Sequence, residues 1–504
     1  MVWSDCIQSL YISSFHVWPH QSRCGMCLHS FKMSESIVLY PSPGMGHLVS
    51  MMELGKLILH HYPTFSIHVL TFNPPFHTGA TAPYMSRIAA EYPAISFHEL
   101  SLPPNQCATF MDWFLVLKPL VREALESFSR RTPVRAFIMD FFCTSVLEDA
   151  EELCIPAYFF FTSAAAFLVL FLYFPELHKQ NPGTLKDLDR DLFIPGLPPM
   201  PLSVFPDSMQ DRSQKLYQWC LHHASRLPRG RGIIINSFHD LEPLGMRALA
   251  FEECAPGVPM PLTYCVGPLI AAGDSRNPSE SLSWLDTQPA GTVVFLCFGS
   301  MGRLSAAQLN EIAVALERSE HRFLWVVRSP PAEGEEMGKR PPEPDLEALL
   351  PEGFLKRTAG KGLVVKTWAP QVAVLNHMAV GGFVTHCGWN SLLESVCAGV
   401  PMAAWPLYAE QHVNAWLMVG EREMGVAVGA VERGEDGVVG AEAVARLVRE
   451  LMDSSRSMRV RERVAKLKER AVAALAEGGT SVTSLAELVN AWLEGPPPPP
   501  PPPR

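Results

Sequence analysis

Two long stretches of the chain alternate short apolar runs with amphipathic segments, and this alternation limits the possible folds more than any other feature. In the first stretch we expect strands at 37–40, 66–71, 134–139, 157–161 and 232–236, with helices at about 47–60 and 164–174. In the second stretch we expect strands at 293–298, 323–327 and 382–385. Strands that alternate with helices form parallel sheets covered on both faces. The sequence therefore predicts an α/β protein with two Rossmann-like domains whose parallel sheets face a central cleft.

The chain is long enough for two such domains, because it has 504 residues and single cores stop growing at about 250–300 residues. We place the linker between about residues 244 and 262, with a second alternating run that begins at Thr263. A last helical segment is expected to pack back on the first domain. The expected parts are an N-terminal domain at 34–255, a C-terminal domain at 256–480, a terminal helix at 481–495 and a polyproline tail at 496–504.

Residues 1–33 lack periodicity and are expected to be a disordered addition, with Met33 as the physiological start. They contain one group that superficially resembles a zinc site, formed by His20, Cys24, Cys27 and His29. The two histidines crowd within a few residues of the cysteines, and no second ligand loop follows. We therefore expect no metal in this segment.

Composition excludes several partners. The formal net charge is −10 and lysine and arginine form no block, which argues against nucleic acid. The 12 cysteines are scattered, as is typical of reduced thiols in the cytoplasm. The longest apolar stretch, 157–174, is interrupted by Thr162 and Ser163, so we interpret it as a strand and a helix with an N-cap there, not as a membrane span. We find no secretory signal, so we expect a cytoplasmic protein. Nothing in the sequence demands more than a monomer.

The first turn after a strand carries glycines and a histidine. Gly44 and Gly46 let the backbone approach a ligand closely, and His47 opens the following helix. A dinucleotide fingerprint would need glycine at Val49, so that interpretation is weak. Asp140 ends another strand, where a carboxylate could hold an imidazole in the tautomer that a general base needs. Taken alone, His47 and Asp140 are each as well explained as helix caps.

The strongest signal is segment 368–411, which reads WAPQVAVLNHMAVGGFVTHCGWNSLLESVCAGVPMAAWPLYAEQ. It holds a strand and a turn that leads into a helix near Trp389, where helix amides with Asn390 and Ser391 would cradle a diphosphate. His386 could add a donor there. The remaining polar and aromatic candidates are Trp368 to stack on a base, Glu394 for a ribose diol, and Glu410 with Gln411 for sugar hydroxyls.

This segment resembles the signature box of the plant family 1 UDP-glycosyltransferases, which have the two-domain GT-B fold. The resemblance extends from Met33 to about Gly495 through ESIVLYPSPGMGHLVSMMELGKLIL, MDFFCTSVLEDA, GIIINSFHDLEP and CFGSMG. In detail the chain looks most like the branch that acts on flavonoids, chalcones and related phenolics. The resemblance implies a hexosyltransferase that uses a UDP-sugar, and the closing Gln411 is similar to that of glucose users.

The resemblance also assigns roles residue by residue. His47 would be the catalytic base and Asp140 its orienting partner. The UDP-sugar positions are Thr162, Ser300, Trp368, Ala369, Gln371, His386, Trp389, Asn390, Ser391, Glu394, Glu410 and Gln411. The acceptor pocket would include Gly46, Phe141 and Phe142, with contributions from residues 74–84 and 199–219.

The implied reaction is a direct displacement with inversion, in which His47 takes the proton of the acceptor hydroxyl as UDP leaves. UDP-glucose would be a co-substrate, a small phenolic would be the acceptor, and no cofactor or metal would be needed. The alternation of Asp187, Asp189 and Asp191 is interpreted as a solvated turn, and Cys387 as a structural thiol. The alternatives are a non-catalytic sugar-nucleotide binder and, with less support, a nicotinamide-dependent oxidoreductase.

Overall fold

The computed structural model describes residues 35–72, 81–101, 110–188, 190–251, 254–272, 279–332, 342–420 and 424–494. The chain divides into two units, residues 1–33 and 34–504, and the first lies outside the described residues. The predictions for 1–33, the zinc-like group, residues 74–80, Asp189 and the polyproline tail therefore lie outside the described residues as well.

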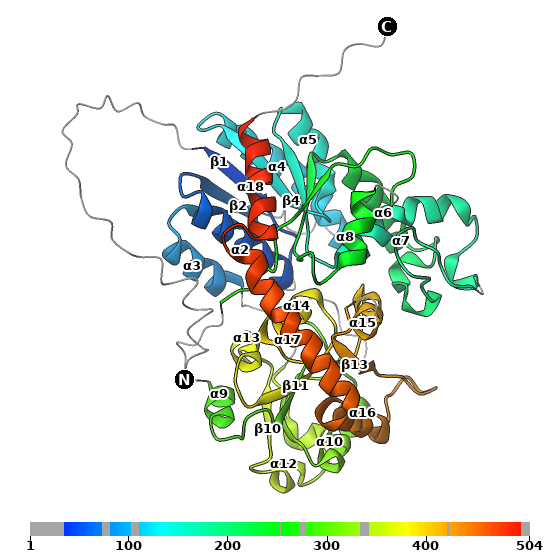
Figure 1. Ribbon diagram of the computed structural model, residues 1–504. Helices are drawn as coiled ribbons and strands as arrows, with labels where there is room; N and C mark the ends of the chain where they lie inside the picture. Colours follow the sequence, from blue (N-terminus) through cyan, green and yellow to red (C-terminus); the bar gives the residue numbers. More distant parts are fainter. Residues whose placement is uncertain are drawn as a thin grey trace, which may run out of the picture. The chain divides into compact units, whose positions relative to one another are not determined.

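The first sheet contains seven strands within the described residues, all parallel (Figure 1). Across the sheet they run β3 (Ile95–Glu99), β2 (Ser66–Thr71), β1 (Ser36–Tyr40), β4 (Val134–Asp140), β5 (Ala157–Phe161), β6 (Gly232–Ile235) and β7 (Leu262–Cys265). All residues of β1 and β5 are buried, since helices cover both faces. The strand order reverses between β1 and β4, and ligands of such sheets bind at the carboxyl end of that switch point.

The second sheet repeats the pattern with six parallel strands in the described part of the chain. Its order is β10 (Gly362–Lys366), β9 (Arg322–Val327), β8 (Val293–Cys297), β11 (Val380–Thr385), β12 (Met402–Ala404) and β13 (Ala427–Ala430). The switch point here lies between β8 and β11. Two parallel, Rossmann-like sheets are thus present, as the alternation predicts.

Helices connect the strands of both sheets. Around the first sheet they are α2 (Met45–His61), α3 (Thr81–Glu91), α4 (Phe110–Ser129), α5 (Leu147–Glu152), α6 (Ala165–Gln180), α7 (Lys215–Arg226) and α8 (Pro243–Ala250). Later in the chain they are α9 (Glu280–Leu285), α10 (Ala306–Ser319), α11 (Leu346–Leu349), α12 (Phe354–Arg357), α13 (Gln371–Leu375), α14 (Trp389–Ala398), α15 (Gln411–Val419), α16 (Ala441–Asp453), α17 (Ser455–Leu475) and α18 (Thr480–Leu493). Short 3₁₀ turns lie at Thr144–Val146, Leu185–Asp187, Leu202–Val204, Asp207–Met209 and Leu227–Arg229.

The predicted domain boundary at 255/256 is wrong. Strand β7 pairs in parallel with β6, so the first sheet continues to Cys265, and α8 occupies part of the predicted linker. Thr263 therefore lies in the last strand of the first sheet and does not begin the second run. The strand is hard to recognise because it has four residues, of which Leu262 is exposed.

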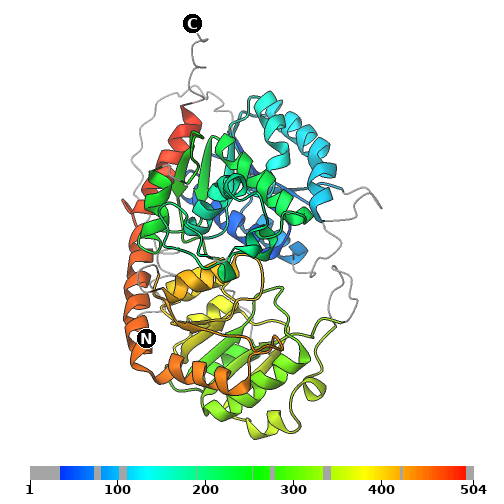
Figure 2. The same ribbon diagram turned by 90° about the vertical axis from the view of Figure 1, so that its right-hand side faces the viewer.

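The last helix returns to the first sheet. Leu485, Leu488, Val489 and Trp492 of α18 belong to the same buried cluster as β1 residue Ile37. The Ser481 hydroxyl donates to the Gly267 carbonyl at 2.6 Å, just beyond β7. Figures 1 and 2 show α17 in orange beside the helices of the second sheet and α18 in red beside the first sheet.

Two predicted helix starts differ in detail. Residues 157–174 do form a strand and a helix, but the N-cap of α6 is Ala164, not Thr162 or Ser163. The carboxylate of Glu242 instead accepts from the amides of Ala165 (2.9 Å) and Ala166 (3.1 Å). No helix among the described residues has the length and apolarity needed to cross a membrane.

At α10, the sequence pattern Ser305 to Gln308 is typical of a capping box, and Ser305 does cap the helix by accepting from the Gln308 amide at 3.2 Å. The reciprocal bond of a capping box does not form at this helix, because the Gln308 side chain bonds both backbone groups of Val439. Gln308 thus joins α10 to the segment before α16.

Candidate functional site

His47 and Asp140 meet at the carboxyl edge of the first sheet. The turn after β1 contains Gly44 at φ 119°, a conformation that favours glycine, and it places His47 in the first turn of α2. Asp140 is the last residue of the neighbouring strand β4 and is fully buried. Its Oδ2 lies 2.7 Å from His47 Nδ1, while Oδ1 accepts from the Phe142 amide at 3.1 Å. Asp140 therefore contacts His47 and its own loop at once.

The geometry fixes the tautomer of His47. A carboxylate only accepts hydrogen bonds, so Nδ1 carries the proton and Nε2 is left with its lone pair. Thr162 Oγ1, after β5, lies 3.2 Å from the same Nδ1. The sequence assigned Thr162 to the UDP-sugar, whereas in the structure its hydroxyl contacts the imidazole of His47.

The environment of His47 raises its pKa. Burial lowers the pKa, but the charge and hydrogen bond of Asp140 and the charge of Glu410 outweigh it. The His47 side chain remains 28% exposed, so it is open to a substrate. A basic, partly accessible nitrogen next to a buried carboxylate is suited to proton abstraction.

Aromatic rings surround His47 on the side of the first domain. The centroids of Phe141 and Phe142 lie 6.2 and 6.0 Å from the imidazole. Behind Phe142, the tilted ring of Trp219 lies with its centroid 4.5 Å away, and His223 lies edge-on at 4.3 Å from Trp219. These tilted rings form an aromatic wall next to the base. The sequence pointed to Phe141 and Phe142 but not to His223.

His223 is a buried polar group that no motif indicated. Its Nδ1 lies 2.7 Å from Thr144 Oγ1, and burial lowers the pKa of His223 to about 3. The imidazole is therefore neutral at physiological pH. Only the fold brings Thr144, after β4, to α7.

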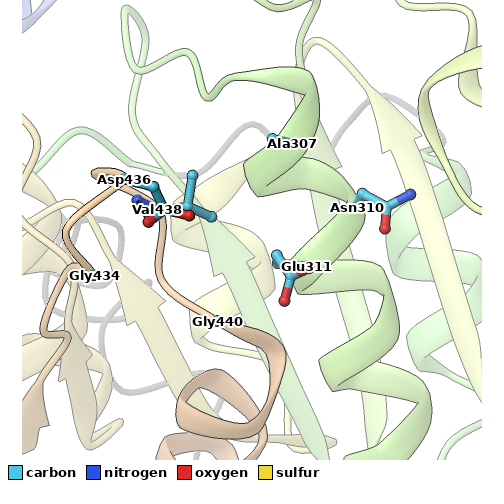
Figure 3. Close-up of a pocket in the computed structure, with 7 residues that line it drawn as sticks. All are labelled: Ala307, Asn310, Glu311, Gly434, Asp436, Val438 and Gly440. Atoms are coloured by element: carbon cyan, nitrogen blue, oxygen red, sulfur yellow. Dashed lines mark hydrogen bonds between the residues drawn. The ribbon is translucent and has the colours of Figure 1, made fainter.

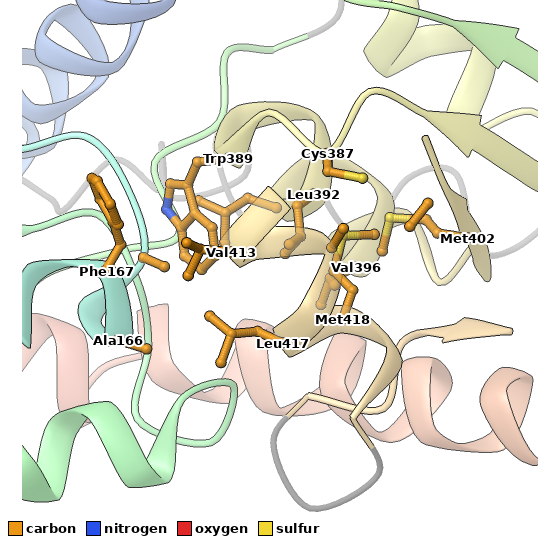
Figure 4. Close-up of a cluster of buried hydrophobic side chains, with 14 of the residues drawn as sticks. Ala166, Phe167, Cys387, Trp389, Leu392, Val396, Met402, Val413, Leu417 and Met418 are labelled. Atoms are coloured by element: carbon orange, nitrogen blue, oxygen red, sulfur yellow. The ribbon is translucent and has the colours of Figure 1, made fainter. Parts of the chain in front are cut away.

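The start of α14 carries the predicted diphosphate residues, but their side chains contact protein groups. Asn390 Nδ2 donates to the Gly46 carbonyl at 3.0 Å, and its Oδ1 accepts from Ser50 Oγ at 2.9 Å. Trp389 Nε1 donates to the Asn236 carbonyl at 2.7 Å, and Figure 4 shows its ring in a buried cluster with Ala166 and Phe167 of α6. The indole N–H of Trp389 is therefore committed to the first half of the chain rather than to a sugar.

Gln371, Ser391 and Glu394 form one network. Gln371 Nε2 donates to Ser391 Oγ and to Glu394 Oε2, both at 2.7 Å. Burial raises the pKa of Glu394 to about 7, although the hydrogen bond from Gln371 opposes the rise. Gln371, a predicted UDP-sugar position, thus contacts Ser391 and Glu394, which the sequence assigned to the diphosphate and the ribose.

His386 fits between two glycines. A Cβ at Gly299 or at Gly388 would lie 2.4 Å from His386 Nε2, so both positions need glycine. Burial and, second, the charge of Arg328 lower the pKa of His386 to about 4. His386 Nδ1 is buried without a partner among the described residues. A neutral ring with an unused nitrogen can donate to a phosphate oxygen but brings no charge.

The remaining predicted residues line the same edge. Gln411 is buried and its Oε1 accepts from the amides of Leu407 and Tyr408, while Glu410 Oε1 lies 3.5 Å from Ser163 Oγ. Trp368 is 65% exposed, which leaves its face open for stacking. The neighbouring Ala369 is buried and Ser300 is exposed after β8.

Other candidates carry no site. A surface hollow between α10 and the loop at 434–440 is shown in Figure 3, away from the residues above. Its Glu311 accepts from the Ala441 amide at 2.6 Å and its Asp436 from Val438 at 3.0 Å, so these groups stabilise local structure. Burial raises the pKa of the Cys387 thiol, and Asp187 and Asp191 are exposed. Among the described residues, no three His, Cys, Asp or Glu side chains group as a metal site.

Known proteins are similar to this chain in sequence and in architecture. The family model "UDP-glucoronosyl and UDP-glucosyl transferase" matches residues 255–459. UDP-glycosyltransferase 1 from Pueraria montana var. lobata is 44% identical over 480 residues, which is 92% of this chain and 100% of that protein. Phloretin 2'-O-glucosyltransferase from Malus domestica is 46% identical over 482 residues, 91% of this chain and 99% of that protein.

A solved structure gives the same result. Phytolacca americana UGT2, complexed with UDP-2fluoro-glucose and pterostilbene, is 36% identical with a TM-score of 0.81. The match covers 91% of this chain and 100% of that one. At this identity and coverage the likeness extends through both sheets.

Proposed function

Since this chain belongs to the plant family 1 UDP-glycosyltransferases, we propose that it transfers glucose from UDP-glucose to a hydroxyl of a flavonoid-type phenolic, with His47 as general base. The observation that carries the role of His47 is the 2.7 Å contact between its Nδ1 and Asp140. That contact leaves Nε2 to receive the acceptor proton. The names of the relatives, which include an enzyme for phloretin and one for anthocyanidin, support a phenolic acceptor.

The proposed reaction is a single displacement. The acceptor oxygen forms a bond to the anomeric carbon, its proton passes to His47 Nε2, and the bond to the UDP oxygen breaks. Attack from the side opposite UDP inverts the anomeric centre, so a β-glucoside is expected. The positive charge on His47 is stabilised by Asp140, and the amides at the start of α14 face the leaving diphosphate.

The donor site is proposed to use Trp368, Ala369 and Gln371 for uracil, Glu394 for the ribose, and Gln411 with Glu410 for the glucose. The exposed face of Trp368 and the connected network of Gln371 and Glu394 support these assignments. We also propose that the reaction needs no metal and that the protein acts as a cytoplasmic monomer. The eight cysteines within the described residues are free thiols, which agrees with a reducing compartment.

The decisive test is product detection with the purified full chain and EDTA. Phloretin, an anthocyanidin and a stilbene are offered with UDP-glucose, UDP-galactose or UDP-glucuronate, and products are measured by mass spectrometry. We expect a gain of one hexose from UDP-glucose, a β-linkage by NMR, and no product with His47→Gln. An α-linked product, full turnover by the His47 variant, or UDP binding without any product would contradict the proposal.

A further inference from the structure

Arg328 holds together two loops of the donor side. It follows β9 directly, at the carboxyl edge of the second sheet, and no sequence motif pointed to it. Its Nη1 donates to the Ser300 carbonyl after β8, and its Nε donates to the Thr367 carbonyl after β10 at 3.1 Å. Ser300 and Trp368, which follows Thr367, are both proposed donor contacts. One guanidinium therefore fixes the loops on either side of its own strand.

Among the described residues, the predicted phosphate contacts carry no positive charge of their own, and the other nearby cation, Arg303, donates to the Ser329 and Pro330 carbonyls. A nucleoside diphosphate carries at least two negative charges. Further negative charge develops on its leaving oxygen as the bond to the sugar breaks. The residues that the sequence places at its phosphates are His386, Asn390 and Ser391, and Ser300 is a further predicted UDP-sugar position. His386 is neutral because its pKa lies at about 4, and the others are uncharged. The charge of Arg328 reaches this site, since it is one cause of the low pKa of His386.

Arg328 is half-buried and keeps unused donors. Guanidinium has five N–H groups, and the two hydrogen bonds that it makes among the described residues go to carbonyl oxygens rather than to a carboxylate. Burial lowers the pKa of Arg328, although the group stays protonated because arginine does so in proteins. A desolvated cation without an anionic partner costs free energy unless a ligand supplies the partner.

These observations point to one ligand. We propose that Arg328 donates to the diphosphate of bound UDP-sugar and supplies a fixed positive charge to this donor site. The proposal rests on the proposed function and adds a residue to its donor site. Arginine suits this position better than lysine, because its planar fork can bond two loops and a phosphate oxygen together.

The test separates phosphate binding from loop positioning. Uridine, UMP and UDP are titrated calorimetrically into the full chain, as wild type, Arg328→Gln and Arg328→Lys. We expect Arg328→Gln to weaken UDP binding roughly 10- to 100-fold, the range for a lost hydrogen bond to a charged group. The loss should be smaller for UMP and within about 3-fold for uridine, which has no charge for Arg328 to bind. Arg328→Lys should recover part of the UDP affinity.

Arg322→Gln is the matched control. Arg322 starts the same strand, at its opposite end, and donates to Gln288 Oε1 (2.6 Å) and to the Gly360 carbonyl (3.1 Å). Its loss should leave UDP affinity unchanged. Equal losses for uridine and UDP, or no loss for UDP, would overturn the role of Arg328. Failure of the wild type to bind UDP at all would instead overturn the proposed function.

Discussion

At the scale of single residues, charge placement decides the chemistry. Asp140 is fully buried, and its two oxygens are used by His47 and by the Phe142 amide. It therefore acts on His47 in two ways, by orienting the ring and by raising its pKa through charge. An amide of the same shape would keep the first effect in part and lose the second.

Asp140→Asn separates these effects. We expect kcat/KM to fall by about 100-fold or more, the range for general-base assistance. Neutral His47 is the active form, so the rate rises with pH through its pKa. Loss of the Asp140 charge lowers that pKa, and the acidic limb of the pH–rate profile should move to lower pH. UDP affinity should be unchanged. An acidic limb at the same pH as in the wild type would show that Asp140 does not raise the pKa of His47.

Glu394 gives the donor site its own pH dependence. The pKa of this carboxyl is raised to about 7 by burial, so much of it is protonated below neutrality. The carboxylate can accept two ribose hydroxyls, whereas the protonated acid gives up one acceptor to its own O–H. UDP affinity should therefore rise between pH 6 and about 7.5 and then level off, with proton release on binding. Titration calorimetry in buffers of different ionisation enthalpy measures this, and Glu394→Gln should bind weakly with a flat profile.

At the scale of elements, α6 depends on a residue from elsewhere in the chain. Eleven of its residues are buried, including every position from Ala165 to Phe174, so water cannot reach its first amides. Glu242 accepts from two of these amides and from Ser237 Oγ at 2.6 Å. Burial raises the pKa of Glu242 to about 6, and the hydrogen bonds from Ser237 and the amides oppose this. The carboxylate takes the place of the missing N-cap side chain.

Glu242→Ala should expose this dependence. It leaves two buried amides without acceptors, which costs about 2–4 kcal/mol in total. We expect a lower melting temperature by circular dichroism and faster hydrogen exchange in the first turn of α6. Glu242→Gln retains one acceptor oxygen, so its melting temperature and its exchange rate in α6 should lie between those of the wild type and of Glu242→Ala. The control Glu311→Ala removes a similar bond to Ala441 of α16, and it should leave exchange in α6 unchanged.

Sequence predicted the central elements well and the peripheral ones poorly. Strands β2 and β5 have the predicted bounds. Strand β5 is a continuous apolar run, and in β2 the buried Ile67 and Val69 lie on either side of the half-buried His68. The strands that had not been predicted are β3, β7, β10, β12 and β13, of three to five residues each. Four of these are sheet edges and β12 lies next to one. Edge strands are short and less buried, so their hydrophobic signal is weak.

The candidate site shows the same division. Turns after strands led to His47, Asp140 and His386, because parallel sheets gather their ligands at the carboxyl edge. Arg328 also lies directly after a strand but carries no motif. Contacts such as Trp389 with Asn236 join residues 153 positions apart, and no local pattern can indicate them. Sequence therefore found the groups and the pairing of His47 with Asp140, but not the contacts that Trp389, Asn390 and Arg328 make.

At the scale of the whole molecule, the first turn of α14 connects the two sheets. Trp389 bonds Asn236 at the end of β6, and Asn390 bonds Gly46 and Ser50 in the first turns of α2. Ser50 is buried, and its hydroxyl also lies 3.0 Å from the Gly46 carbonyl. The helix that carries His47 thus holds the side chain of a residue proposed to face the diphosphate. Donor binding and placement of the base should be coupled through this contact.

A double-mutant cycle measures that coupling. Ser50→Ala leaves Asn390 Oδ1 without its donor, so we expect kcat/KM to fall roughly 2- to 10-fold, the equivalent of one ordinary hydrogen bond. If the contact is what links the two sheets, Ser50→Ala should have little further effect in an Asn390→Ala background, with a coupling energy of about 1 kcal/mol. Ser145→Ala, which removes a bond to the Phe114 carbonyl within the first half of the chain, should be additive with Asn390→Ala. Additive effects of Ser50→Ala would mean that His47 and the donor side are positioned independently, and non-additive effects would make α14 the element through which UDP orients the base.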